Sequence, residues 1–240
     1  MPGPIAPAPP SPQRLARHDH ALEKAVEAML RHDDRVRGLD VRARFSGGVA
    51  HLTGQVGSAG SLSVLRRLIG QLAGVYAVWS RVRVGGRAPV HLDLGCGTTK
   101  QYDGSIGVDR RPTPAVTVLA DLSRTLPFRT GSVDAVFAVH LIEHLYDFLP
   151  LIDECHRVLR PDGTLHLMSP WWGHINAVAD PTHVRLLDVQ TVKGICTRPG
   201  APRWRPLHAS CDGVSVFADL TPMPTDAPEL DATELARFFD

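Results

Sequence analysis

Five residues stand at spacings that would suit the binding of a nucleotide. They are Gly95, Gly97, Asp109, Asp121 and His140, and each follows a short apolar run typical of a buried strand. Ligands of open parallel sheets bind beyond the carboxyl ends of the strands. We therefore expect these five residues to gather at one edge of a sheet.

The residue types fit an adenosine. Glycines let the backbone approach a ligand closely because they carry no side chain. Asp109 could accept hydrogen bonds from both ribose hydroxyls, Asp121 could accept one from an exocyclic amine, and the Leu122 amide could face a ring nitrogen. A dinucleotide fits less well, since its G-x-G-x-x-G fingerprint has an acidic residue about 20 positions on. Here Lys100 takes the third glycine position, and Asp109 lies only 14 residues after Gly95.

The elements that must position these residues follow from the apolar pattern after residue 89. We predict strands at 90–94, 104–109, 116–119, 134–139, 164–168 and 214–220, a helix at 148–159 and a short helix at 232–239 capped by Asp231. Strands that alternate with helices indicate a Rossmann-like, doubly wound α/β fold with a mostly parallel sheet. Only ten residues separate Leu94 from Ser105. That is close to the lower limit for a helical crossover, so the first helix should shrink to about a turn.

Longer segments of this half carry a family resemblance. HLDLGCGTTK, IGVD, LADL, FRTGSVDAVFAVHLIEHL and HRVLRPDGTLHLMSP together resemble class I S-adenosylmethionine-dependent methyltransferases of the small-molecule type 11 group. The GCGxxK loop and the DPTHxR segment at 180–185 are similar to a compact subgroup. The resemblance covers residues 89 to about 190. It implies S-adenosyl-L-methionine as the cofactor and methyl transfer to an oxygen or nitrogen atom of a small-molecule acceptor.

The resemblance also implies which residues bind the cofactor. The loop around the methionine moiety comprises Asp93, Gly95, Cys96, Gly97 and Lys100. Asp109 matches the ribose-binding acid, Asp121 and Leu122 match the adenine contacts, and Val139 and His140 match the segment beside the sulfonium.

Catalytic residues are sought among the histidines, because imidazole titrates near neutral pH. Methyl transfer from a sulfonium is an in-line displacement, in which the protein aligns the acceptor and can remove one proton. Candidates for the base are His140, His144, His174 and His183, and we expect the catalytic set to be His174, Asp180, His183 and Arg185. The last three could orient an anionic or hydroxylated acceptor, although a hydrogen-bonded loop that shapes the fold would also explain them. We expect no metal site, because the spacing of these residues is not diagnostic of one.

Residues 19–85 show a different order of elements. We predict helices at 21–31 and 61–72 and strands at 39–45, 49–53 and 75–84, with a tight turn at 46–48. This order and the segment GGVAHLTGQV resemble the BON domain of bacterial envelope and osmotic-stress proteins, a small α+β domain associated with phospholipid or envelope binding. Residues 1–18, rich in proline and alanine, are expected to form a disordered leader. After a short linker, the methyltransferase-like domain should span residues 89–240.

Charge separates the two halves. Residues 1–88 hold 13 Lys and Arg against 6 Asp and Glu, and residues 89–240 hold 13 against 19, so the net charge of +1 hides values of +7 and −6. Four arginines and a tryptophan share one predicted face of the basic half: Arg42, Arg44, Arg81, Arg83 and Trp79. This face could bind an anionic lipid or a phosphate, stay solvated, or dock on the acidic half. No element that reads a nucleic-acid sequence is recognisable.

Composition narrows the class of protein. No apolar run approaches the roughly 18 residues of a membrane-spanning helix. The first residues lack the layout of a secretory signal, and the four cysteines form no C-x-x-C pair. We therefore expect a cytoplasmic methyltransferase. The alternative is a scaffold that binds phospholipid, envelope or a partner and in which the methyltransferase fold is degenerate.

Overall fold

A long helix opens the N-terminal domain. The computed structural model describes residues 11–224 and 226–239, and its first helix is α1 (Pro12–His32). Ser11 caps this helix by accepting a hydrogen bond from the Arg14 amide, and Pro12 suits the first turn, where no backbone N–H is needed. The prediction of a disordered leader is therefore wrong for residues 12–18. Residues 1–10 of that predicted leader lie outside the described residues.

Two helices cover one face of a small N-terminal sheet. β1 (Asp40–Ser46) and β2 (Val49–Val56) form an antiparallel hairpin, α2 (Ala59–Gly70) follows, and β3 (Ala77–Ser80) and β4 (Arg83–Val84) pair in parallel with β2. The strand predicted at 75–84 is thus broken after Ser80. Buried apolar residues of both helices pack with Leu52 of β2. Asp19 ties α1 to the hairpin, because its carboxylate accepts from the Gly47 and Gly48 amides at 2.8 and 2.9 Å.

Seven strands form the sheet of the C-terminal domain, in the order β10-β11-β9-β8-β5-β6-β7. Their bounds are β5 (His91–Leu94), β6 (Ile106–Asp109), β7 (Val118–Leu119), β8 (Val133–Val139), β9 (Leu159–Pro170), β10 (Trp204–Cys211) and β11 (Ser215–Pro222). β5 to β9 pair in parallel, and β11 is antiparallel to both β9 and β10. The predicted mostly parallel α/β sheet is confirmed.

Helices of this domain pack on one face of the sheet. They are α3 (Leu149–Val158), α5 (Val189–Cys196) and α6 (Ala232–Phe239), with a 3-10 turn η1 (Ile142–His144) and the short α4 (Asn176–Ala179) nearer the loops. Asp231 caps α6 as predicted, since Asp231 Oδ1 accepts a hydrogen bond from the Glu234 amide at 2.8 Å. α4, α5 and β10 lie where no element is predicted. None of the described helices combines the length and apolar character needed to cross a membrane.

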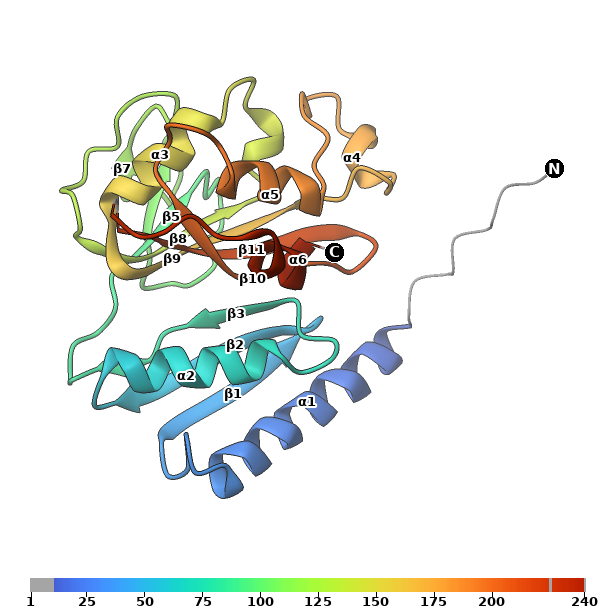
Figure 1. Cartoon of the computed structure of the whole chain (residues 1–240). Helices are drawn as coiled ribbons and strands as arrows, with labels where there is room; N and C mark the ends of the chain where they lie inside the picture. Colours follow the sequence, from blue (N-terminus) through green and yellow to red (C-terminus); the bar gives the residue numbers. More distant parts are fainter. Residues whose placement is uncertain (1–10, 225, 240) are drawn as a thin grey trace.

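The N-terminal sheet covers the other face. The described stretches between β5 and β6 and between β6 and β7 contain no helix, in agreement with the expected short first crossover. In place of such helices, Ala135 and Phe137 of β8 pack against Val49, Ala77 and Trp79 of the N-terminal domain. Figure 1 shows the small sheet below the large one, with α3 and α5 on the opposite side of the large sheet.

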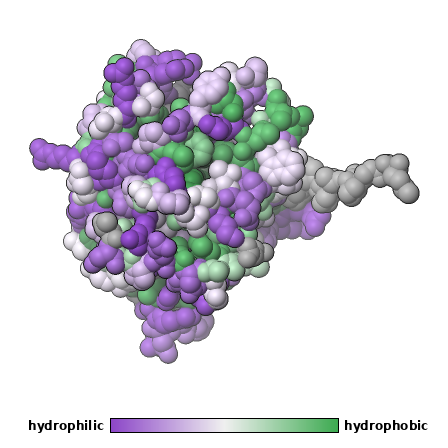
Figure 2. Space-filling model, turned by 45° about the horizontal axis from the view of Figure 1, so that its top comes forward, coloured by the Kyte–Doolittle hydropathy of each residue, from purple (hydrophilic) through white to green (hydrophobic). Residues whose placement is uncertain are grey.

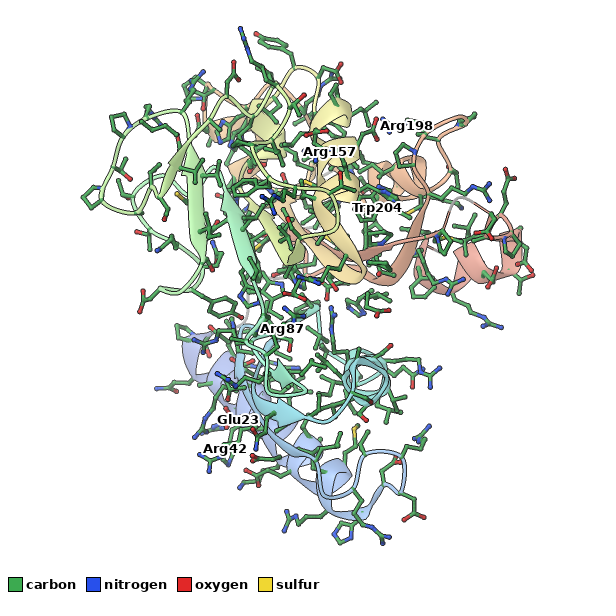
Figure 3. All side chains as sticks on the ribbon, turned by 90° about the vertical axis from the view of Figure 1, so that its left-hand side faces the viewer. Glu23, Arg42, Arg87, Arg157, Arg198 and Trp204 are labelled. Atoms are coloured by element: carbon green, nitrogen blue, oxygen red, sulfur yellow. The ribbon has the colours of Figure 1, made fainter. Side chains whose placement is uncertain are left out.

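Polar contacts also join the domains. Asp219 of β11 is buried, accepts a hydrogen bond from the Val78 amide of β3 at 2.8 Å and contacts His166 Nδ1 at 2.6 Å. In the linker, the Arg87 guanidinium pairs with the Asp134 carboxylate at 2.6 Å. Figure 3 shows Arg87 at the level where the two domains meet.

The predicted arginine face is only partly a free surface. Trp79 is 5% exposed because it packs against the C-terminal sheet, so it does not lie among solvent-exposed arginines as expected. The Arg81 guanidinium lies over the ring of Tyr102, 4.4 Å from its centre. Arg42 and Arg44 on β1 remain exposed.

Candidate functional site

The structure brings the predicted glycine loop and Asp109 together at the carboxyl edge of the large sheet. Gly95 and Gly97, directly after β5, have φ angles of +65° and +55°, which glycine adopts without strain. The Gly97 amide donates to Asp109 Oδ2 at 3.0 Å, and the Arg111 amide donates to its Oδ1 at 3.0 Å. The space beside Gly97 is open. A ligand can therefore approach the backbone closely at Gly97, whereas the Leu141 side chain fills the space beside Gly95.

Three other predicted loop residues support the loop from inside. Asp93 is 2% exposed, and burial raises its pKa to about 6 even though the Gln101 amide donates to its Oδ2. Burial likewise raises the pKa of the Cys96 thiol. Lys100 Nζ donates to the Ser105 carbonyl at 3.0 Å, within the short crossover. The lysine thus holds the backbone of its own segment.

Asp121 and Leu122 follow β7 at the same edge. The Asp121 carboxylate is exposed and accepts hydrogen bonds from the amide and hydroxyl of Ser123 at 3.0 and 2.7 Å, and these bonds lower its pKa. The Leu122 side chain is buried. The adenine contact assigned to this pair stays a prediction.

His140 occupies a strained backbone position just after Val139, the last residue of β8. Its φ is +52°, and no other non-glycine residue of the described ranges has a positive φ. A side chain in this region costs about 1–2 kcal/mol, and such strain concentrates at functional sites. His140 Nδ1 lies 3.2 Å from Oε1 of Glu143, whose Oε2 accepts from the Ser169 hydroxyl at 2.9 Å. Sequence reasoning missed Glu143, although this 1% exposed acid stands beside His144 in the segment IEH.

A pocket of about 520 Å³ opens beside His140. Its lining residues are His140, Pro170, Asn176, Ala179, Asp180, Pro181, His183 and Ser215. Two of the predicted catalytic residues, Asp180 and His183, therefore lie in its wall, where Asp180 Oδ2 and His183 Nε2 are 3.9 Å apart. Hydrogen bonds from the amide and hydroxyl of Thr182 lower the pKa of Asp180.

His174 and Arg185, the other two predicted catalytic residues, are not among the lining residues. His174 Nδ1 accepts a hydrogen bond from the Asn176 amide at 3.2 Å. The Arg185 guanidinium donates to the Tyr146 carbonyl. Both side chains contact loop backbone in this structure, and their catalytic role stays a prediction.

Comparison with protein families assigns both domains. Residues 92–167 match the model of a methyltransferase domain, and residues 18–86 match that of the BON domain. The fold and the edge with the glycine loop thus belong to a methyltransferase domain of class I architecture. The chain as a whole carries this domain behind a BON domain, as the resemblances in its sequence imply.

Known relatives are similar to parts of the chain. An uncharacterized 37.1 kDa protein in transposon TN4556 of Streptomyces fradiae is 35% identical over 103 residues, which are 34% of this chain and 30% of that protein. A probable S-adenosylmethionine-dependent methyltransferase of Mycolicibacterium smegmatis is 44% identical over 45 residues, which are 19% of this chain and 18% of that protein. The chain therefore matches less than a third of the length of either relative.

Solved structures share the fold at low similarity. A SAM-dependent methyltransferase from Archaeoglobus fulgidus is 18% identical, with a TM-score of 0.41 over 70% of this chain and 95% of that one. A likeness this distant adds nothing to the argument about function.

Proposed function

We propose that the protein transfers a methyl group from S-adenosyl-L-methionine to an oxygen or nitrogen atom of a small molecule. The observation that carries the proposal is the meeting, at one sheet edge, of the glycine loop and Asp109 with His140 and the pocket beside it. In this proposal Gly95 and Gly97 face the methionine part of the cofactor and Asp109 binds the ribose. The acceptor binds in the pocket, next to the wall formed by Asp180 and His183.

Methyl transfer requires the protein to align the acceptor atom with the methyl group and to remove one proton from the acceptor. Since Nδ1 of His140 faces Glu143, its Nε2 is the nitrogen that can take the proton from the acceptor. The acceptor atom forms a bond to the methyl carbon as the carbon–sulfur bond breaks. The electron pair of that bond stays on sulfur, and S-adenosylhomocysteine leaves. Glu143 acts as a positioning residue, because it is buried and touches His140 rather than the pocket.

Calorimetry with S-adenosylhomocysteine tests the cofactor part of the proposal. We expect the wild type to bind one molecule per chain and Asp109→Asn to bind it at least about tenfold more weakly, because the neutral amide is a poorer acceptor for hydroxyl groups. Asp162→Asn, at an exposed position of β9, is the control and should bind like the wild type. Wild-type protein that binds no S-adenosylhomocysteine would contradict the proposal.

The acceptor carries an apolar part, in our proposal, because exposed apolar side chains stand next to lining residues of the pocket along the chain. Ile175 and Val178 of the α4 segment are 66% and 60% exposed, and Trp172 and Leu186 are more than half exposed as well. Figure 2 shows that hydrophobic areas interrupt the hydrophilic surface on this side of the molecule. Incubation with deuterium-labelled cofactor and fractionated small molecules, read by mass spectrometry, should label acceptors in the apolar fractions.

A lipid- or partner-binding scaffold is the second candidate function. It is supported by the exposed arginines of β1, since Arg44 is 82% exposed at its side chain. Flotation of the full chain with vesicles containing anionic phospholipid tests it, with Arg42→Glu/Arg44→Glu as the comparison. Salt-sensitive flotation that the double variant loses would favour the scaffold.

We also propose a cytoplasmic location in a bacterium, which the four free cysteines support.

A further inference from the structure

We propose that Glu143, His144 and His183 bind a divalent transition-metal ion beside the acceptor pocket, whose wall includes His183. One potential ligand atom from each of the three residues lies within 4.8 Å of the others. The binding of the ion stands on these contacts alone, whereas its role in the reaction rests on the proposed methyl transfer. Sequence spacing predicts no metal site, because His183 comes from a loop about 40 residues further along the chain.

The backbone holds the two contributing segments together. The Glu143 carbonyl accepts hydrogen bonds from the Val184 and Arg185 amides at 2.8 and 3.2 Å, so the η1 turn and the loop after α4 are paired. The rings of His144 and His183 lie edge to face with centroids 4.7 Å apart. Metal–ligand bonds of about 2.1 Å bring ligand atoms to about 3.4 Å from one another. The side chains would therefore close by roughly 1 Å around an ion, without movement of the backbone.

Hydrogen bonds set both imidazoles in a tautomer suited to metal binding. His183 Nδ1 lies 3.1 Å from the Ala177 carbonyl, which can only accept, so this nitrogen carries the proton. Thr182 gives its hydroxyl proton to Asp180 at 2.7 Å, so His144 Nδ1, 3.0 Å from the same oxygen, must donate to it. Nε2 of each ring is then left with a free lone pair. Metal-binding histidines show this pattern, with the second nitrogen donating to an oxygen.

The burial of Glu143 adds to these distances. Glu143 is 1% exposed and touches a hydroxyl and the His140 ring, and among the ion pairs of the described residues none joins it to a lysine or arginine. A buried carboxylate needs a compensating positive charge. A metal ion bound by Glu143 and two neutral imidazoles would provide that charge.

The ligand set indicates the class of metal and its role. Two imidazoles and one carboxylate suit zinc, iron(II), cobalt(II) or nickel(II) rather than magnesium or calcium. Three protein ligands leave positions open, and His183 and Asp180 put these positions at the pocket wall. There an ion would bind the acceptor oxygen and lower the pKa of its hydroxyl group. The proposal therefore favours hydroxylated acceptors over amines.

Metal titration of the full chain tests the proposal. The protein is first treated with a chelator and then titrated with Co²⁺, followed by visible absorption, and with Zn²⁺ in competition. We expect one ion per chain, bound at micromolar concentration or below. His183→Ala and His144→Ala should each weaken binding at least about tenfold. His174→Ala, just before α4 and outside the cluster, is the control and should bind like the wild type.

Thermal melting and S-adenosylhomocysteine binding of each variant show whether it is folded, and His183→Gln replaces His183→Ala if the latter is not. Wild-type protein without stoichiometric Co²⁺ or Zn²⁺ binding would overturn the proposal. Folded His144 and His183 variants that bind the ion as tightly as the wild type would overturn it as well. The two proposals fail separately. Metal binding without S-adenosylhomocysteine binding contradicts methyl transfer, and the reverse result contradicts the metal site.

Discussion

Asp93 is the buried acid on which the glycine loop rests, and its titration couples stability to pH. Burial raises its pKa from 3.8 to about 6. Because the pKa is higher in the folded state, folding favours the protonated acid. The stabilising contribution is fully present below about pH 3.8 and is lost as the pH rises through about 6. At neutral pH the ionised Asp93 therefore lowers the free energy of unfolding.

Asp93→Asn should remove this pH dependence. The amide keeps an oxygen for the Gln101 amide and carries no charge. We expect the variant to be more stable than the wild type by about 2 kcal/mol at pH 7.5, with the difference vanishing near pH 4. Urea unfolding at several pH values measures it. Asp103→Asn, exposed in the same crossover, is the control, and a gain that does not vary with pH would contradict the argument.

At the scale of elements, the β5–β6 crossover shows how a missing helix is compensated. Its Tyr102 is 7% exposed, and the hydroxyl lies 2.9 Å from His51 Nδ1 of β2. Arg81 covers the ring of Tyr102 from the same domain. The segment that follows the glycine loop is therefore held by side chains of the BON domain, where a longer crossover would use its own helix.

Trp79 of β3 is the largest side chain that the BON domain contributes to this packing. Its ring lies 5.2 Å from that of Phe137 and 6.0 Å from that of His166. Trp79→Ala should lower the free energy of unfolding by about 3–5 kcal/mol, because it leaves a cavity between the two sheets. Tyr146→Ala, at a 78% exposed position, should change it by less than about 0.5 kcal/mol. Similar losses in both variants would mean that the interface contributes little to stability.

The sequence predicts helices and strands whose apolar pattern lies within a few neighbouring residues. It does not predict contacts between residues far apart in the chain. Strand β8 is apolar at every position but one, β5, β6 and β9 contain shorter apolar stretches, and the rule that ligands bind at strand ends predicted that Gly97, Asp109 and His140 lie at one edge. β10 was not predicted, because its sequence WRPLHASC contains a proline and polar residues and only part of the strand is buried. The contacts of Glu143 with Ser169 and of Val78 with Asp219 join residues far apart in the chain. A local pattern of apolar residues cannot predict such contacts.

The BON domain and the methyltransferase domain bury apolar side chains in one shared cluster. The BON domain covers the sheet face that carries Ala135, Phe137 and Phe217, and the contacts there are mostly apolar and aromatic. We expect the full chain to unfold in one cooperative transition by differential scanning calorimetry, and residues 89–240 alone to bind a dye for exposed apolar surface. Two well-separated transitions in the full chain would contradict this.

The shared sheet face has a consequence for how the chain can change over evolutionary time. A substitution on β3 alters a neighbour of β8 or β11, so the two segments cannot diverge independently as domains joined by a free linker can. Exchange of this BON domain for another would carry a foreign surface onto Phe137 and leave Asp219 without the Val78 amide. The two segments are therefore expected to be inherited together, with changes on one side of the interface matched by changes on the other.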